Sequence, residues 1–498
     1  MSQSPLTSTI RWIETQLSVP RAGIGGHFLS LGLLSLISAW TAVATETYWL
    51  MGLPLLVIGA FWAAVDFKAL FFALFAFIPI STEVFLPNGF ATDLPTEPLI
   101  VGLMFVTVLY LLRNSTLIDG RFFRHPLSIL IFLHWGWIGV CSFLSDEPFI
   151  SFKYFLAKTW YLATFYILAG LILRSENRLR LWFWCVTIPL IFSVLVTLFR
   201  HGYSYGFTFD TINKVTWPFY RNHVNYAATL SVFFPILWLA RGWYTRLNKR
   251  YWLLTGMALV LLAGINFAYT RAAYVALAGA LGAWWIIRKQ WIKPALFLAL
   301  AFAISLSTWL VYKNKYLEYA PNYERTVTHY RFDNLLEATY KMEDISTMER
   351  FYRWVAGGYM AVEHPWMGFG PGNFPTFYRT YTVTSFQTYV SDNPENSGIH
   401  SYYLMTLVEQ GFPGLMIFLL LTCFPFLMAE RLYHRHWNHS GYRRLILMMA
   451  LCLVVIHAFL TINDLVETDK LGSFFFTCMA VLVNIDTGRL QLKQEEAH

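Results

Sequence analysis

The chain has 498 residues, of which 56% are hydrophobic and only 13% are charged, and its mean hydropathy is +0.47. So little charge cannot cover the surface of a soluble globule of this length, which excludes soluble folds and predicts a membrane protein. The formal net charge of +8 does not indicate a nucleic-acid partner, because Lys and Arg lie in short clusters between apolar runs rather than on one basic face.

Apolar runs long enough to cross about 30 Å of hydrocarbon as a helix recur along the whole chain. They predict an all-α polytopic membrane protein with about 12–14 transmembrane helices. The fourteen predicted spans are residues 22–44, 47–66, 69–88, 98–112, 126–145, 154–173, 179–199, 223–240, 252–269, 271–287, 294–312, 412–429, 444–462 and 470–486. The first is long and lacks a small-residue cleavage site, which favours a span over a cleaved signal peptide. The second and third are the weakest.

Basic residues set the expected orientation, because cytoplasmic loops carry an excess of Lys and Arg. Five basic clusters fall on the same side of the predicted spans, within residues 113–124, 174–180, 241–250, 288–293 and 431–444. The intervening loops near 83–97, 146–147 and 464–469 are acidic or neutral. Both termini are therefore expected in the cytoplasm.

The five cysteines all lie inside predicted spans, which argues against disulfides and CxxC metal pairs.

The longest connection lies on the outer side and is too long for a linker and too aromatic for disorder. Within it, Ser346-Thr-Met-Glu349 matches a capping box that opens a helix, and His364-Pro365 with the Gly-rich GFGPGNF closes that helix. The predicted organisation is eleven transmembrane helices in residues 1–311, a large outer helical loop in 312–411, and three more helices with a cytoplasmic tail in 412–498.

Outer arginines are informative because they oppose the orientation bias. Arg271, in YTRAAYVAL, begins a predicted span, where the helix dipole disfavours a cation. A bound anion would reverse that penalty, since helix N–H groups and a guanidinium together form a phosphate site. The alternative is an arginine that snorkels to lipid headgroups.

Arg350 opens the loop helix one turn before Trp354, so a second cation occupies a first helical turn. Arg353 lies on a neighbouring face and is its rival for the same role. An ion pair with Glu349 or Glu343 is the alternative reading of Arg350. His400 faces the same outer surface, where a short interfacial helix is expected before Gly411–Gly414 breaks it.

These residues resemble the signature of the O-antigen ligase and polymerase-like superfamily. His400-Ser401, nine residues, then Gly411-x-x-Gly414 matches its outer-loop pattern. The segment ERFYRWVAGGYMAVEHPWMGFGPGNF is similar to the family's Arg-x-x-x-Trp helix and Gly-rich turn, and YTRAAYVAL to its Ser/Thr-Arg motif. The likeness covers roughly residues 205–430, whereas the first half of the chain matches only as a series of spans.

The resemblance implies a GT-C type glycosyltransferase in the bacterial inner membrane, with its active site on the periplasmic side. The donor would be a glycan on undecaprenyl diphosphate. The acceptor hydroxyl would lie on lipid A-core for a ligase, which is the preferred reading, on another carrier-linked glycan for a polymerase, or on a protein for an O-oligosaccharyltransferase. Arg271 and Arg350 would hold the diphosphate, and His400 would deprotonate or orient the acceptor hydroxyl.

No metal or other cofactor is expected, because guanidinium forks can take up the charge of a diphosphate leaving group in place of a divalent cation. The nearest carboxylate pair of the metal-dependent kind, Glu467-Thr-Asp469, lies in the late outer loop, whereas metal-dependent relatives of this type place theirs in the first outer loop.

Secondary candidates for donor contacts start another predicted span, in YRNHVNYAATL: Arg221, His223 and Asn225. Arg353 and Trp354 are candidates for the same role.

A transporter or flippase remains as a function of another class. It is disfavoured because transporters place binding charge near the bilayer midplane, whereas these residues gather at one face.

Overall fold

The computed structural model describes residues 21–45, 53–85, 91–114, 119–319, 345–386, 391 and 397–492. Part of the outer loop expected between the eleventh and twelfth spans, residues 320–344, therefore lies outside the described residues. The chain divides into two units, residues 1–70 and 71–498. In the described part of the chain almost every element is a helix, which confirms the predicted fold class.

The first unit contains α2 (Arg21–Ala44) and the start of α3 (Leu53–Phe77). The predicted spans 47–66 and 69–88 meet within α3, where Asp66 leaves helical geometry, with φ −149° and ψ 81°, and separates two helical segments. The predicted end at residue 88 is wrong, because the helix ends at Phe77 and residues 82–85 form a strand. Asp66 Oδ1 accepts the N–H groups of Lys68 at 3.0 Å and Ala69 at 3.2 Å, so it caps the part of the helix that follows the kink.

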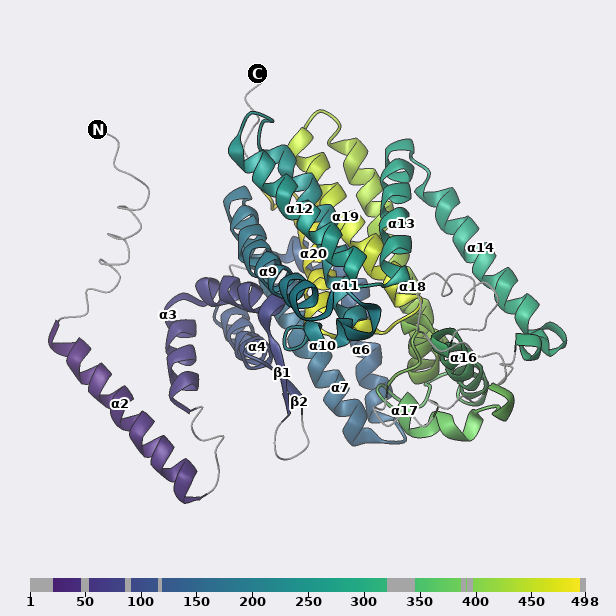
Figure 1. The fold of residues 1–498 in the computed structure, drawn as a ribbon, viewed down its shortest axis with the longest axis horizontal. Helices are drawn as coiled ribbons and strands as arrows, with labels where there is room; N and C mark the ends of the chain where they lie inside the picture. The colour runs from purple at the N-terminus through teal and green to yellow at the C-terminus, as the bar shows by residue number, and fades with distance from the viewer. Residues whose placement is uncertain are drawn as a thin grey trace. The chain divides into compact units, whose positions relative to one another are not determined.

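The second unit begins with the end of α3 and a short antiparallel hairpin of β1 (Thr82–Phe85) and β2 (Ala91–Leu94), in which Thr82 pairs with Leu94. Six helices follow in chain order (Figure 1): α4 (Thr96–Arg113), α5 (Gly120–Phe123), α6 (Pro126–Phe143), α7 (Pro148–Tyr161), α8 (Ala169–Ile172) and α9 (Glu176–Tyr205). A π-helical turn, η4 (Leu162–Leu168), joins α7 to α8, so these three form one continuous rod.

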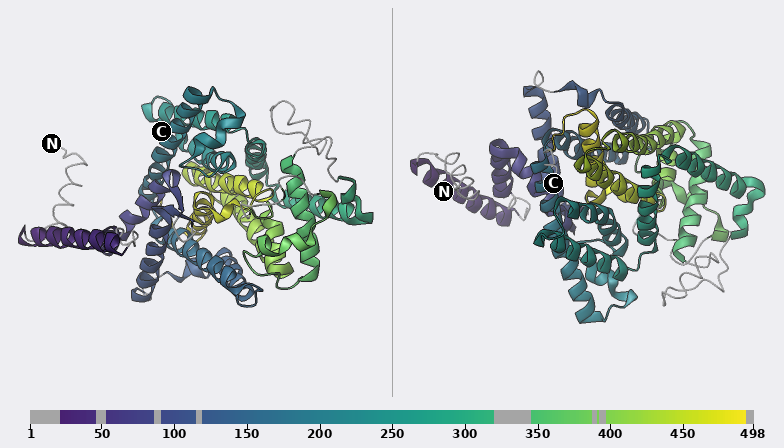
Figure 2. Two further views of the ribbon diagram at one scale, coloured as in Figure 1. Left: turned by 60° about the horizontal axis from the view of Figure 1, so that its bottom comes forward. Right: turned by 90° about the horizontal axis from the view of Figure 1, so that it is seen from above.

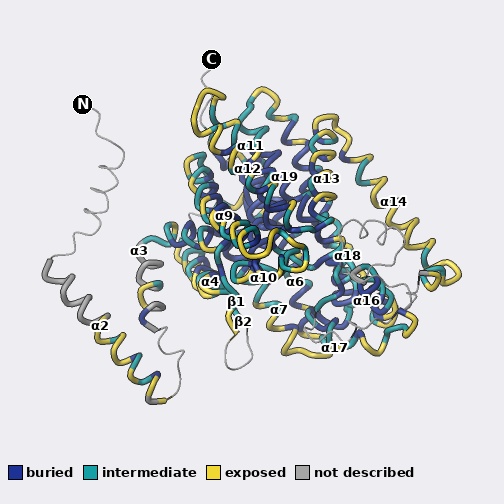
Figure 3. The backbone as a smooth tube through the Cα atoms, in the orientation of Figure 1, coloured by how far each residue is buried: buried dark blue, intermediate teal, exposed yellow. Residues whose placement is uncertain are grey.

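The middle of the chain forms α10 (Ile212–Thr216) and four long helices: α11 (His223–Ala240), α12 (Lys249–Phe267), α13 (Arg271–Lys289) and α14 (Ile292–Val311). Two of these start at an Asn that accepts a backbone N–H, because Asn222 caps α11 and Asn248 caps α12. Residues of α14 are largely exposed, as the colouring in Figure 3 shows, which is the pattern of an apolar helix that faces lipid.

The remaining helices are α16 (Ile345–Glu363), α17 (Phe374–Phe377), α18 (Tyr402–Arg435), α19 (Ser440–Leu460) and α20 (Asp469–Asp486). Helices α19 and α20 form the core, because most side chains of α19 and nearly all those of α20 are buried. Helices α16 and α17 lie beside the start of α18 in both views of Figure 2.

Nine helices of the described residues are long and apolar enough to cross a membrane. Together with α2, α3, α13 and α20 they overlap all fourteen predicted ranges, of which 47–66 and 69–88 fall on the two segments of α3. Helix α18 begins ten residues before the predicted span at 412 because it includes the predicted interfacial helix. The predicted interfacial helix and the predicted span are its two segments, separated by a break at Gly411, where φ is 69° and ψ is −174°.

Candidate active site

The Gly-rich turn after α16 docks on the backbone of the first turns of α18. Phe369 N donates to Val408 O at 3.0 Å, Gly370 N donates to Glu409 O at 3.0 Å, and Phe412 N donates to Pro365 O at 2.7 Å. A side chain at Gly411 would collide with the carbonyl of Trp366, and its φ of 69° also favours glycine. The interruption in α18 is therefore the place where this turn is bound.

Glu409 anchors the same turn through its side chain. Its carboxylate accepts the backbone N–H groups of Gly372 at 2.8 Å and Phe374 at 3.1 Å, and the residue is only 1% exposed. Burial removes the hydrogen bonds that a carboxylate makes to water. Here two backbone N–H groups replace those bonds, so the buried group stabilises the turn. The GFGPGNF segment is thereby a structural clamp between α16 and α18.

His400 sits directly before α18 in a left-handed backbone conformation, with φ 57°. Ser401 follows as the N-cap of α18 and accepts the N–H of Leu404 at 3.5 Å. Ile399 packs against α16 at Gly357, where a Cβ atom would collide with its side chain. The glycine in α16 thus lets the segment that carries His400 approach the helix closely.

Arg353 is the residue that contacts His400. Its Nη1 lies 2.7 Å from His400 Nε2 and also donates to the Gly398 carbonyl at 3.0 Å and to Ser397 Oγ at 3.2 Å. The Arg353 side chain is almost fully buried, and its Nη2 lies 3.7 Å from the Glu349 carboxylate. Arg353 thus forms an ion pair with Glu349, one of the two acids that the sequence offered to Arg350.

This contact sets the tautomer of His400. A guanidinium has donors only, so Nε2 must accept the hydrogen bond and the ring proton must lie on Nδ1. Nδ1 is buried and has no hydrogen-bond partner among the described residues. Burial first, and then the charges of Arg353 and Arg350, lower the pKa of His400 to about 3. The imidazole is neutral at physiological pH.

The loop between α19 and α20 covers this cluster. Arg350 Nε donates to the Ile462 carbonyl at 3.4 Å, and the carboxylate of Asp464 lies against Gly398, where it would collide with an added Cβ atom. Burial is the main cause that raises the pKa of Asp464, while the charges of Arg353 and Arg221 lower it. The charge of Asp464 is therefore partly balanced by Arg353 and by the exposed Arg221.

The starts of α11 and α13 lie next to each other. Thr270 Oγ1, at the N-cap of α13, is 3.5 Å from the His223 carbonyl, so Arg271, the first residue of α13, lies beside His223. The His223 ring and backbone N–H both bond Asn213 Oδ1, at 2.8 and 2.9 Å. Asn225 Oδ1 is buried without a hydrogen-bond partner in the described part of the chain.

The predicted residues thus fall into two neighbouring groups. Arg350, Arg353 and His400 form one, to which Trp354 belongs through α16, with its buried Nε1 unbonded within the described residues. Arg271, His223 and Asn225 form the other, at the starts of α13 and α11. Arg221, shortly before α11, and Arg353 both lower the pKa of Asp464 by their charge. Sequence reasoning missed Asp464; the available signal was an acid directly after a predicted span.

The carboxylates of Glu467 and Asp469 point to different partners. Glu467 pairs with the buried Lys158 at 2.7 Å and accepts the Tyr154 hydroxyl at 2.7 Å. The Asp469 carboxylate, 2% exposed, accepts the hydroxyl of Thr96 at 2.8 Å. Among the described residues no group of three His, Cys, Asp or Glu side chains could hold a metal ion.

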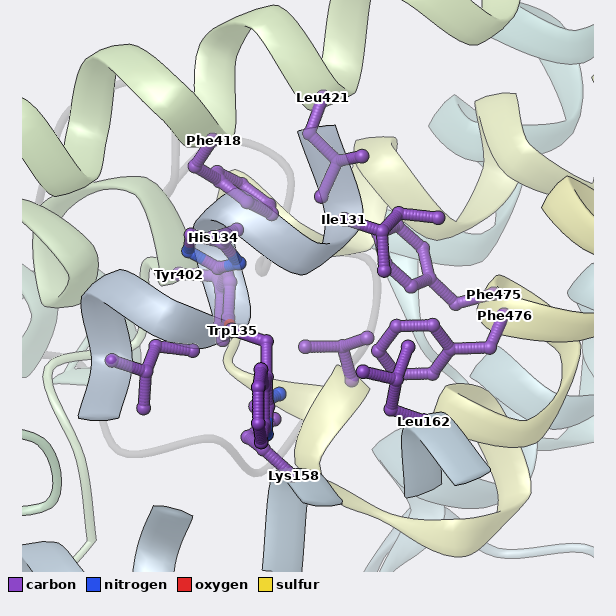
Figure 4. Close-up of a pocket in the computed structure, with 12 residues that line it drawn as sticks. Ile131, His134, Trp135, Lys158, Leu162, Tyr402, Phe418, Leu421, Phe475 and Phe476 are labelled. Carbon is purple, nitrogen blue, oxygen red and sulfur yellow. The ribbon is translucent and has the colours of Figure 1, made fainter. Parts of the chain in front are cut away.

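A small cavity lies between α6, α7, α18 and α20 (Figure 4). Its volume is about 20 Å³, and most of its lining is apolar, with His134, Lys158 and Tyr402 as polar members. That volume accommodates about one water molecule, so a sugar cannot enter. Lys158 is a buried charge within a predicted span, and it is matched by the Glu467 carboxylate.

One part of the chain matches a known protein family. Residues 256–419 match a family model described as O-antigen ligase. The matched segment runs from α12 into α18, so it includes Arg271, Arg350, Arg353, Trp354 and His400. The match confirms the resemblance to the O-antigen ligase-like superfamily and supports a glycosyltransferase of that kind. A comparison with curated proteins finds no match.

Proposed function

We propose that this chain, of which residues 256–419 match a family model described as O-antigen ligase, transfers a glycan from undecaprenyl diphosphate to an acceptor hydroxyl at the periplasmic face of the inner membrane. Lipid A-core is the preferred acceptor. The observation that carries the proposal is the contact between Arg353 and His400, with Arg350 close enough to lower the same pKa.

Arginine side chains supply the charge that the reaction needs. Breaking the bond between the anomeric carbon and the diphosphate leaves an anion on the carrier, and guanidinium forks stabilise such an anion by paired hydrogen bonds. Arg271 adds a cation at the N-terminus of the 19-residue helix α13, where backbone N–H groups also face the anion. We assign the diphosphate to the space between Arg271, Arg350 and Arg353.

His400 is assigned to the acceptor. While Arg353 donates to Nε2, that nitrogen has no lone pair left for a proton. A bound diphosphate attracts Arg353 toward itself, which frees Nε2 and replaces a neighbouring cation by an anion, so the pKa of His400 rises. Nε2 then accepts the proton of the acceptor hydroxyl. Donor binding thus switches on the base.

The bond changes follow from this arrangement. The acceptor oxygen forms a bond to the anomeric carbon, its proton passes to His400, and the bond from that carbon to the diphosphate oxygen breaks with the electron pair leaving on undecaprenyl diphosphate. Attack from the face opposite the diphosphate inverts the anomeric carbon. The charge of the leaving group is taken up by guanidinium groups and helix N–H groups, so the proposal contains no metal.

Transfer in a purified system tests the proposal. The protein in detergent is given a lipid-linked glycan together with lipid A-core, a second carrier-linked glycan or a periplasmic protein as alternative acceptors. Product on lipid A-core supports the ligase; product on another acceptor instead supports the polymerase or the protein O-oligosaccharyltransferase. Detergent has no second compartment, so any transfer excludes a transporter as the sole function, and no transfer to any acceptor contradicts the proposal.

A further inference from the structure

A cavity of about 240 Å³ lies at the end of the second unit's helices opposite to His400. Helix α11 starts at His223, beside the candidate active site, and ends at Ala240, directly before the Gly242–Trp243 wall of the cavity. A helix of 18 residues spans about 27 Å, which is close to the thickness of the hydrocarbon layer. The cavity and the candidate active site therefore lie about one membrane thickness apart.

The walls of the cavity are held together by backbone contacts. Glu176 N, at the start of α9, donates to the Gln491 carbonyl at 3.2 Å, and Gln491 N donates to the Arg174 carbonyl at 3.1 Å. Tyr442, in the first turn of α19, donates its hydroxyl to the Leu490 carbonyl at 2.8 Å. Residues 490–492 thus connect the first turns of α9 and α19, and Leu492 lines the cavity between them.

Two arginines line this cavity, each near the start of a long helix. Arg180 is the fifth residue of α9 and Arg444 is the fifth residue of α19, and both line the space. These are N-terminal turns of helices with 30 and 21 residues, where the helix dipole disfavours a cation and favours an anion. The first turn of α19, SGYR, contains no acid, while Glu176 in α9 pairs with Arg180, with 2.9 Å between Oε1 and Nε.

The rest of the lining suits the boundary between water and lipid. The Arg180 guanidinium lies 5.3 Å from the ring centre of Trp243, which fixes its plane, and tryptophan favours the membrane interface. His439 and Gly441 bring further polar groups from the start of α19. Apolar lining comes from three leucines, Leu179, Leu445 and Leu492. One side of the cavity is thus cationic and another is apolar.

We propose that this cavity binds the phosphate headgroup of an anionic membrane phospholipid. The phosphate would lie between Arg180 and Arg444 at the two helix starts, and the glycerol part would lie toward the leucines. A free phosphate ion shares the charged contacts but gains nothing from the leucines, so the lipid should bind more tightly. This site is separate from the glycan transfer chemistry and does not depend on the acceptor.

Lipid binding by the purified full-length protein tests the proposal. Native mass spectrometry and thermal unfolding in a neutral detergent compare phosphatidylglycerol, phosphatidylethanolamine and inorganic phosphate as probes. We expect phosphatidylglycerol to bind and stabilise the wild type, with weaker effects of the other two. Arg444→Gln should weaken phosphatidylglycerol binding about tenfold or more, as for loss of a charge-assisted hydrogen bond.

Arg443→Gln is the matched control, because it removes the same charge from the adjacent residue. Arg443 lies over the rings of Trp437, at 4.9 Å, and Tyr433, at 5.8 Å. Its variant should bind phosphatidylglycerol like the wild type. If Arg444→Gln does not accumulate, Arg180→Gln replaces it and should weaken binding further, since Glu176 would then repel the phosphate. Equal binding by the wild type and the cavity variant, or equal effects of inorganic phosphate and phosphatidylglycerol, would overturn the proposal.

Discussion

Nη1 of Arg353 donates a hydrogen bond of 2.7 Å to Nε2 of His400, so the nitrogen best placed to act as a base is already occupied. A proton on that nitrogen would bring two cations into contact inside a buried cluster. The pair therefore keeps His400 neutral until something moves Arg353. A donor diphosphate is the proposed cause of that movement, which would make catalysis depend on the donor being bound first.

Replacing Arg353 by Gln should shift the pH dependence of transfer. The pKa of about 3 keeps wild-type His400 neutral at every pH above that value. Removal of a neighbouring cation raises this pKa toward its ordinary value near 6.5, although burial still opposes the charged form. The variant's His400 then becomes protonated at a higher pH, so kcat/KM for the lipid-linked donor, which reports the donor-free enzyme, should fall earlier on acidification. A pH profile of kcat/KM measures this.

Arg353→Lys is the control for that shift, since it keeps the positive charge but loses the planar fork. Its acid limb should stay near that of the wild type, while KM for the lipid-linked donor should rise. Superimposable pH profiles of Arg353→Gln and the wild type would show that Arg353 does not govern His400.

His400→Ala should lower kcat by about a hundredfold or more, as for loss of an acid-base group, with little change in donor KM. The protein should still be inserted, because the N-cap of α18 is Ser401 rather than His400. Single-turnover transfer with saturating donor checks this. His364→Ala is a suitable control, because that imidazole lies near the Gly-rich turn and its side chain is 42% exposed. Wild-type turnover in the His400 variant would remove the base from the mechanism.

Arg350→Lys and Arg271→Lys should both be poor enzymes, although they keep their charge. A lysine is a point charge and cannot bond two phosphate oxygens at once, so we expect roughly a tenfold to hundredfold loss of kcat/KM. The alanine variants should lose about a hundredfold or more. Steady-state kinetics with varied donor measure both effects. Full activity of Arg350→Lys would argue that Arg350 supports the loop at Ile462 rather than the donor.

Glu409→Ala should destabilise the protein rather than alter its chemistry. The change leaves the N–H groups of Gly372 and Phe374 buried without their acceptor, at a cost of about 1–3 kcal/mol for each donor. A lower midpoint of thermal unfolding in detergent is the expected result. Glu363→Ala, at a side chain that is 55% exposed near the same turn, should leave the midpoint almost unchanged.

Chelation of metal ions should not reduce turnover, because the proposed charge stabilisation comes from guanidinium and backbone groups. Transfer is measured with and without EDTA, followed by addition of Mg²⁺. Strict dependence on Mg²⁺ would direct attention to Glu467 and Asp469, whose present partners, Lys158 and Thr96, would then have to give way.

Local signals in the sequence predicted the helices well. The range 223–240 is reproduced by α11 because an Asn cap precedes it and a basic cluster follows it. At α18, Gly411 and Pro413 predict a break, and the backbone does leave helical geometry at Gly411, where φ is 69°. A second helical segment follows directly, with Phe412 N bonded to the carbonyl of Pro365 and the turn around Trp366 packed into the space beside Gly411. That bond is a tertiary contact, which a local pattern cannot reveal.

The candidate site shows the same contrast between local patterns, which the sequence reveals, and tertiary contacts, which it does not. The sequence predicted that Arg350, Arg353 and His400 share one surface, because all three lie in the longest connection. It could not predict which arginine contacts His400, since that depends on how the 397–400 segment packs on α16 at Gly357. Asp464 was missed for a similar reason. Its position over Gly398 depends on contact between loops that lie more than sixty residues apart in the sequence.

The attachment of the Gly-rich turn to α18 has a consequence for protein engineering. Glu409 and Gly411 belong to one helix but hold a turn that lies about forty residues earlier in the chain. An exchange of this loop between homologues, made to change acceptor choice, must therefore include both the Gly-rich turn and its anchor on α18. The exchanged segment would run from the start of α16 to beyond Gly414. A chimera joined at His400 would combine a turn from one parent with an anchor from the other.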